Sequence, residues 1–125
     1  MKNLLIQAAL ALSLVVLGHE AVIAHGGATA RHGGVVQLAS DLSFELVALT
    51  DGAAIYVEDH GKPLAPTGMS GKLTVLNGSE RSEGNLVASG DRLEAKGVKL
   101  ASGAKAVAAL TTANKKAITV RFTMK

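Results

Sequence analysis

The sequence predicts an all-β domain: an antiparallel β-sandwich of immunoglobulin-like shape with about seven or eight short strands, or a small barrel. Three observations predict it. Apolar and polar residues alternate with a period of two through most of residues 35–124, as in strands with one buried face. Turn-forming Gly, Asn, Asp and Ser recur roughly every 8 to 12 residues. The Ala-rich segment 104–111 has helix propensity, but it is short and flanked by turn signals, which favour a strand.

Residues 1–24 have the pattern of a signal peptide. Lys2 supplies the positive charge, and Leu4–Leu17 is an apolar core. That core is shorter than the roughly 20 apolar residues needed to span a bilayer. The small residue Ala24 predicts a cut that would make His25 the first residue of the mature protein. Two alternatives are a cut after Gly18 and an uncleaved N-terminal anchor.

This cut predicts a simple domain organisation. We expect a signal peptide over residues 1–24, a flexible mature N-terminus over 25–33 and a β-domain over 34–125, with no membrane span in the mature chain. About 100 residues remain after the cut, enough to bury a core without covalent cross-links. The chain has no cysteine, which excludes disulfides and thiolate metal sites.

The first part of the expected domain contains three strands. Val35–Ala39 is a short strand, and Ser40-Asp41 forms the turn after it. Leu42–Thr50 has the clearest alternation of apolar and polar residues. Asp51-Gly52 predicts a two-residue hairpin turn of type I′, because glycine tolerates the positive φ that this turn requires. The chain then returns as a strand over Ala53–Asp59.

The second part of the expected domain begins with a loop. His60–Met69 contains two prolines and two glycines, a composition typical of loops. Gly84 is a weak point or bulge in a later strand. The further strands are expected at 71–77, 80–88, 92–95, 104–111 and 117–124.

A repeated tripeptide marks the expected start of the mature chain. His-Gly-Gly occurs at residues 25–27 and again at 32–34. An N-terminal His25 would offer both its α-amine and its imidazole to one metal ion, and His32 or His60 would add a second imidazole. Nitrogen ligands in a square arrangement suit Cu(II). We therefore predict a site for Cu(II) or another divalent transition metal. The competing interpretation is an ordinary disordered terminus.

The dipeptide Asp59-His60 is the second candidate for metal chemistry. It directly follows an expected strand, so both side chains should lie at one end of the sheet. Asp59 would either orient the imidazole of His60 or bind the metal itself. The competing interpretation is a capped turn with an exposed histidine.

Other classes of function have little support in the sequence. There is no Gly-x-Ser-x-Gly, no cysteine nucleophile and no glycine loop that opens a helix. Lys and Arg are scattered along the chain, Trp is absent, and there are only two Phe and one Tyr. Nucleic-acid binding usually needs a basic stripe and stacking aromatic residues. We therefore expect neither an enzyme nor a nucleic-acid-binding protein.

Four segments resemble a known group of proteins. They are His32-Gly33-Gly34-Val35-Val36, Phe44-Glu45-Leu46-Val47, the run Ile55-Tyr56-Val57-Glu58-Asp59-His60-Gly61-Lys62-Pro63, and Gly71-Lys72-Leu73-Thr74-Val75-Leu76. The chain resembles small exported β-domain proteins of Gram-negative bacteria, which are similar to the N-terminal module of periplasmic adaptor proteins in heavy-metal efflux systems of the resistance-nodulation-division type. The likeness covers roughly residues 32–124.

The resemblance implies a periplasmic β-domain connected with the handling of copper or of cobalt, zinc and cadmium. We therefore expect a metal-handling accessory protein associated with efflux or resistance, with an efflux adaptor as a possible partner. The alternative is an interaction module that binds no metal and docks on an efflux adaptor or another envelope protein. In that case the exposed strand edges would be the contact surface.

Overall fold

The computed structural model describes residues 29–125, which contain nine β-strands. No helix in this range is long and apolar enough to cross a membrane. The predicted signal peptide and His25 lie outside the described residues. The strands are β1 (Val35–Ala39), β2 (Leu42–Leu49), β3 (Gly52–Asp59), β4 (Lys62–Leu64), β5 (Ser70–Asn77), β6 (Glu80–Ser89), β7 (Arg92–Lys96), β8 (Lys105–Thr111) and β9 (Ala117–Thr123).

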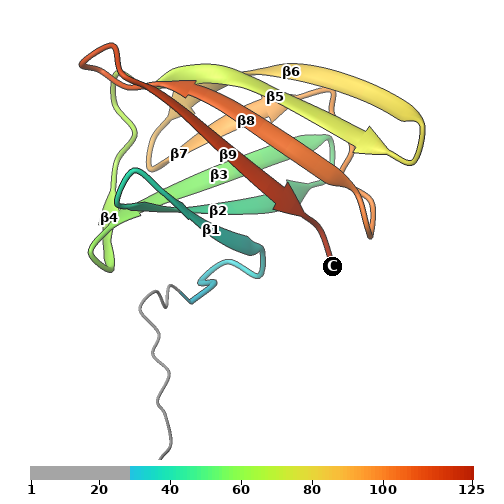
Figure 1. Ribbon diagram of the computed structural model, residues 1–125, viewed down its shortest axis with the longest axis horizontal. Coiled ribbons are helices and arrows are strands. Elements are labelled where there is room, and N and C mark those ends of the chain that lie inside the picture. The colour runs from blue at the N-terminus through green and yellow to red at the C-terminus, as the bar shows by residue number, and fades with distance from the viewer. Residues whose placement is uncertain (1–28) are drawn as a thin grey trace, which may run out of the picture.

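All neighbouring strands are antiparallel and form one sheet in the order β1-β2-β3-β7-β6-β5-β8-β9, with β4 paired to the end of β3. The sheet curls until β1 lies beside β9, so that it is barrel-like and nearly closed (Figure 1). The all-β prediction is confirmed. A sandwich of two sheets is not confirmed, because the β3–β7 and β5–β8 pairings join all the strands into one continuous sheet.

The core lies inside the curl and comes from alternate residues of the strands. In β9, Ile118, Val120 and Phe122 are buried while the residues between them are exposed, as the period-two pattern predicts. Phe44 and Leu46 of β2 face the same interior. Six of the twenty buried apolar residues are alanines, and nine are Leu, Ile or Phe.

The predicted type I′ turn at Asp51-Gly52 is wrong. Leu49 pairs with Gly52, so the turn is Thr50-Asp51 and Gly52 is the first residue of β3. Gly52 does not have a positive φ. Glycine is required here because the neighbouring strand β7 lies very close: a Cβ at this position would be 2.1 Å from the carbonyl oxygen of Ala95.

The segment predicted as a loop over His60–Met69 contains the short strand β4. A two-residue turn, His60-Gly61, joins β3 to β4, and both residues have positive φ, 53° and 82°. This combination is the one that a type I′ turn requires. Pro63 is tolerated in β4 because a short edge strand need not donate every hydrogen bond. The turn places His60 at the far end of β3.

Candidate functional site

The candidate site is built around a buried carboxylate on the outer face of the sheet. Glu45 lies in the middle of β2 between Phe44 and Leu46, which face the core, so its own side chain points outward. It is nevertheless only 6% exposed, because the segment Arg31–Gly34 runs over it. Buried carboxylates are rare unless they have partners.

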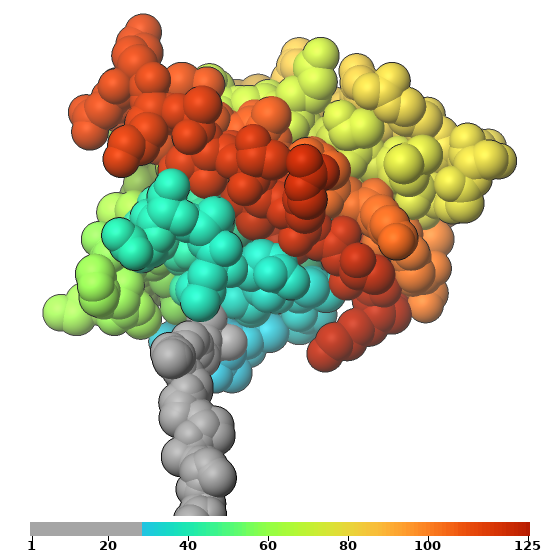
Figure 2. Space-filling model, viewed as in Figure 1, coloured from blue at the N-terminus to red at the C-terminus, as the bar shows by residue number. Residues whose placement is uncertain are grey.

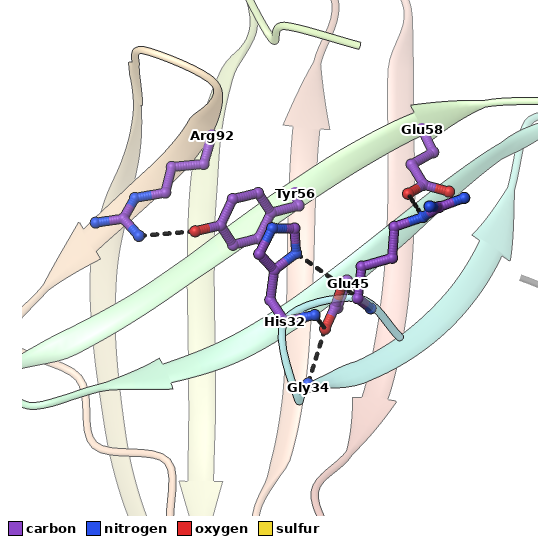
Figure 3. A network of polar contacts seen from close by, with 7 residues as sticks. His32, Gly34, Glu45, Tyr56, Glu58 and Arg92 are labelled. Carbon is purple, nitrogen blue, oxygen red and sulfur yellow. Dashed lines mark hydrogen bonds and ion pairs between the residues drawn. The ribbon is translucent and has the colours of Figure 1, made fainter. Parts of the chain in front are cut away.

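Four groups donate hydrogen bonds to this carboxylate (Figure 3). The backbone N–H of Arg31 donates to Oε1 at 3.0 Å, and the N–H groups of His32 and Gly34 donate to Oε2 at 2.8 Å each. Nδ1 of His32 lies 3.1 Å from Oε1. Burial alone would raise the pKa of Glu45, but the three backbone bonds and the imidazole outweigh burial and hold the pKa below its ordinary value. Glu45 is therefore ionised at neutral pH.

The same contacts bear on the expected domain boundary. The sequence placed residues 25–33 in a flexible mature terminus and began the domain at residue 34. In the structure Glu45 fixes the backbone of Arg31, His32 and Gly34. The packed structure therefore extends at least to Arg31.

The imidazole of His32 is held in a defined orientation. Its ring stacks on Tyr56 with 3.5 Å between centroids and 4° between planes. The Glu45 carboxylate beside Nδ1 favours the tautomer that carries its hydrogen on Nδ1, which leaves the lone pair on Nε2. The side chain is 40% exposed, so a solute can reach it. A carboxylate on one nitrogen and a free lone pair on the other is the usual arrangement of a metal-binding histidine.

Tyr56 is itself held by the next strand of the sheet. Nη1 of Arg92 donates to the Tyr56 hydroxyl at 2.9 Å, and the guanidinium lies 5.8 Å from the centre of its ring. Nε of Arg92 also donates to Glu94 at 2.8 Å. These contacts tie the aromatic platform beneath His32 to β7 and limit its freedom to move.

Arg31 fixes the other side of the segment. Its Nε lies 2.5 Å from a carboxylate oxygen of Glu58, and its Nη2 donates to the carbonyl oxygen of Gly61 at 3.1 Å. The segment is thus anchored at Glu45 through its backbone, at Tyr56 through His32 and at the β3–β4 turn through Arg31.

The two positions after His32 require glycine for different structural reasons. Gly33 has a φ of 79°, a value that residues with a Cβ rarely adopt. A Cβ on Gly34 would lie 2.1 Å from the carbonyl oxygen of Leu46. Gly33 therefore turns the chain and Gly34 lets it pass close to β2. The two glycines of the tripeptide His32-Gly33-Gly34 are therefore needed to hold His32 in its position over β2 and β3.

The predicted pair Asp59 and His60 is also in contact, but it lies elsewhere. Nδ1 of His60 is 2.6 Å from Oδ1 of Asp59, and the imidazole is 87% exposed. Asp59 thus contacts the imidazole on Nδ1, as expected for an orienting partner. His32 lies over the middle of β3, whereas His60 lies at the turn beyond its end. Within residues 29–125, no three His, Asp or Glu side chains converge on a point that could hold a metal ion.

Glu45 and Tyr56 are site residues that the sequence did not predict. A signal was present, because Glu45 is a single charged residue inside an otherwise largely apolar strand.

A small pocket lies beside Glu45 and Tyr56, with a volume of about 10 Å³, room for one water at most. Its lining consists of Thr29, Val36, Ser43, Glu45, Tyr56 and Glu58.

Comparisons with protein-family models, with curated proteins and with solved structures find no match to this chain. The resemblance to efflux adaptor modules therefore stays a prediction.

Proposed function

We propose that the chain is an exported, periplasmic metal-binding protein rather than an enzyme, and that it handles Cu(II) or another divalent ion for an efflux or resistance system. His32 is the ligand that the geometry supports best. The observation that carries the proposal is the contact of its Nδ1 with the buried carboxylate of Glu45, which leaves Nε2 as the donor nitrogen on a half-exposed ring.

Preorganisation supports this assignment. Stacking on Tyr56 and the Glu45 hydrogen bond restrict the ring before any metal arrives, so little further side-chain entropy is lost on binding. In known metal sites, removing a group that hydrogen-bonds to a ligating histidine lowers metal affinity or activity by about 10- to 100-fold. His60 has the same carboxylate contact, but its high exposure leaves it less restricted.

A single imidazole does not make a tight site, so further ligands are required. We propose that His25 supplies its α-amine and imidazole after cleavage of the leader. Five residues lie between His25 and Arg31, which the structure anchors beside the site. Asp59 and His60 are the alternative source of ligands, as a separate exposed pair.

The test is a calorimetric titration of Cu(II) and Zn(II) into the chain that begins with a native His25, which measures the affinity for each metal. The variant His32→Phe keeps an aromatic ring over Tyr56 but removes the ligand. We expect it to weaken Cu(II) binding about tenfold or more. Adding one residue before His25 should weaken binding as well, because the α-amine moves away.

His60→Asn is the matched control, because asparagine is preferred at the positive φ of this turn. We expect it to bind Cu(II) like the parent chain. Equal affinity of the parent and His32→Phe would overturn the assignment of His32. Absence of binding to the parent would overturn metal handling and leave the interaction module as the function.

A further inference from the structure

Basic side chains gather on one wall of the sheet. Residues 95–125 contain seven Lys and Arg and no Asp or Glu. The Lys and Arg residues are scattered in the sequence as a whole, but most of this segment, after the end of β7, folds into the adjacent strands β8 and β9 and the turns around them. We call five of these residues the basic face, and all of them are exposed: Lys105, Lys115, Lys116, Arg121 and Lys125.

The register places these charges on the outer side of one hairpin. Val107 pairs with Arg121, and Lys105 pairs with Thr123, so Lys105 and Arg121 are diagonal neighbours on the same side. Lys115 and Lys116 lie at the turn that joins the two strands. Figure 2 shows β8 and β9 running side by side across the front of the molecule. The other outward residues of the hairpin are Val107, Ala109, Thr111, Ala117, Thr119 and Thr123.

Among residues 29–125, no carboxylate forms an ion pair with the basic face. The six ion pairs among residues 29–125 all join residues between Arg31 and Glu94. The positive charges of β8 and β9 are therefore solvated, and their potentials add over the hairpin.

We propose that the basic face docks on an anionic phospholipid surface. The composition of the face favours lipid over a protein partner. Stable protein interfaces are enriched in aromatic residues, Met and Arg and depleted in Lys, whereas four of these five residues are Lys and the hairpin exposes no aromatic side chain. Clustered Lys and Arg are attracted to anionic lipid without any hydrophobic anchor.

This docking would orient the metal site. Around the nearly closed sheet, β8 lies four strands from β3 in either direction, so the basic face and the wall that carries His32 are on opposite sides. With the basic face on lipid, the wall that carries His32 faces the aqueous phase. The docking proposal does not depend on whether His32 binds metal.

The test uses the chain from His25 onward, which contains every described strand, and measures cosedimentation with vesicles. Vesicles of phosphatidylglycerol mixed with phosphatidylcholine should bind it at low salt, and vesicles of phosphatidylcholine alone should not. Each basic residue near an anionic surface contributes about 1 kcal/mol, roughly a factor of five. The double variant Lys105→Thr, Arg121→Thr should therefore bind about 25-fold less.

The control is the double variant Lys62→Thr, Arg81→Thr, which changes the net charge by the same amount away from β8 and β9. It should keep most of the binding. Circular dichroism confirms that each variant is folded. Equal loss in both double variants would overturn a localised docking face. Lack of vesicle binding, with retention of the parent on immobilised polyglutamate, would overturn lipid in favour of an acidic protein.

Discussion

Two opposite walls of one sheet use charge in different ways. On the wall of β2, β3 and β7, acidic and basic side chains are paired, and one carboxylate is buried beneath the segment that carries His32. On the wall of β8 and β9, exposed cations have no carboxylate within ion-pair distance among residues 29–125. The first arrangement fixes a side chain in place, whereas the second leaves side chains mobile and attracts a partner from a distance. Removing a charge should therefore change stability on the first wall and association on the second.

The largest effect is expected for Glu45→Ala. Three backbone N–H groups and one imidazole would lose their acceptor under a covering segment, and an unsatisfied buried donor costs about 1–3 kcal/mol. We expect a loss of about 3 kcal/mol in the free energy of unfolding in urea. Glu58→Ala removes only the partially exposed pair with Arg31 and should cost less than about 1 kcal/mol. Equal costs would show that Glu45 does not organise this wall.

The next largest loss of stability is expected for Gly34→Ala, and it should exceed the loss for Gly33→Ala. Gly34→Ala places a Cβ against the carbonyl oxygen of Leu46, so the segment must move away from β2. We expect a loss of about 2 kcal/mol or more. Gly33→Ala meets no atom within 4 Å and costs only the strain of its positive φ, about 1 kcal/mol. Chemical denaturation of both variants checks the order, and a greater loss for Gly33→Ala would contradict the close passage of the chain over β2.

A smaller effect is expected on the pH dependence of stability. The folded-state pKa of Glu45 lies below its ordinary value of 4.5, because the backbone and His32 hydrogen bonds favour the ionised form. Its contribution to stability is therefore complete above about pH 4.5 and is lost as the pH falls below that value through the folded-state pKa. Unfolding in urea between neutral pH and pH 3 measures this loss. Glu45→Gln should show a weaker dependence over that window, and an unchanged slope would contradict the role given to the carboxylate.

The smallest effect is expected on the opposite wall. Arg121 is exposed and makes no ion pair with another residue of 29–125, so Arg121→Thr should change the free energy of unfolding by less than about 0.5 kcal/mol. Thermal and urea unfolding of this variant, beside Glu45→Ala, compare the two walls directly. A loss above about 1 kcal/mol would mean that this wall also uses its charges for stability.

The sequence predicted the strands better than it predicted their connections. Period-two alternation and the turn residues between strands located every described strand except β4 to within one residue at each end, because burial on one side of a strand leaves that pattern. The role of Gly52 was missed, because a glycine required by a neighbouring strand looks the same in sequence as one required by a turn. Whether the strands form one sheet or two depends on pairings between distant residues, and local patterns do not encode these.

The candidate site was predicted only in part. Residue type and spacing predict His25, His32, His60 and Asp59 as ligands, and His25 lies outside the described residues. His60 has the predicted contact with Asp59. The contact of His32 with Glu45 was not predicted. Glu45 was missed because strand alternation says which way its side chain points but not that residues 31–34 cover it. The basic face was missed for a similar reason, because its residues become neighbours only through the β8–β9 pairing.

The role of Glu45 in orienting His32 is tested most directly by nitrogen-15 NMR of the two His32 ring nitrogens, with and without Zn(II). We expect the neutral imidazole to carry its hydrogen on Nδ1, facing Glu45, and its lone pair on Nε2, and we expect Zn(II) to shift the Nε2 resonance while Nδ1 keeps its hydrogen. A neutral imidazole with its hydrogen on Nε2, or a His32 spectrum that Zn(II) leaves unchanged, would contradict this role.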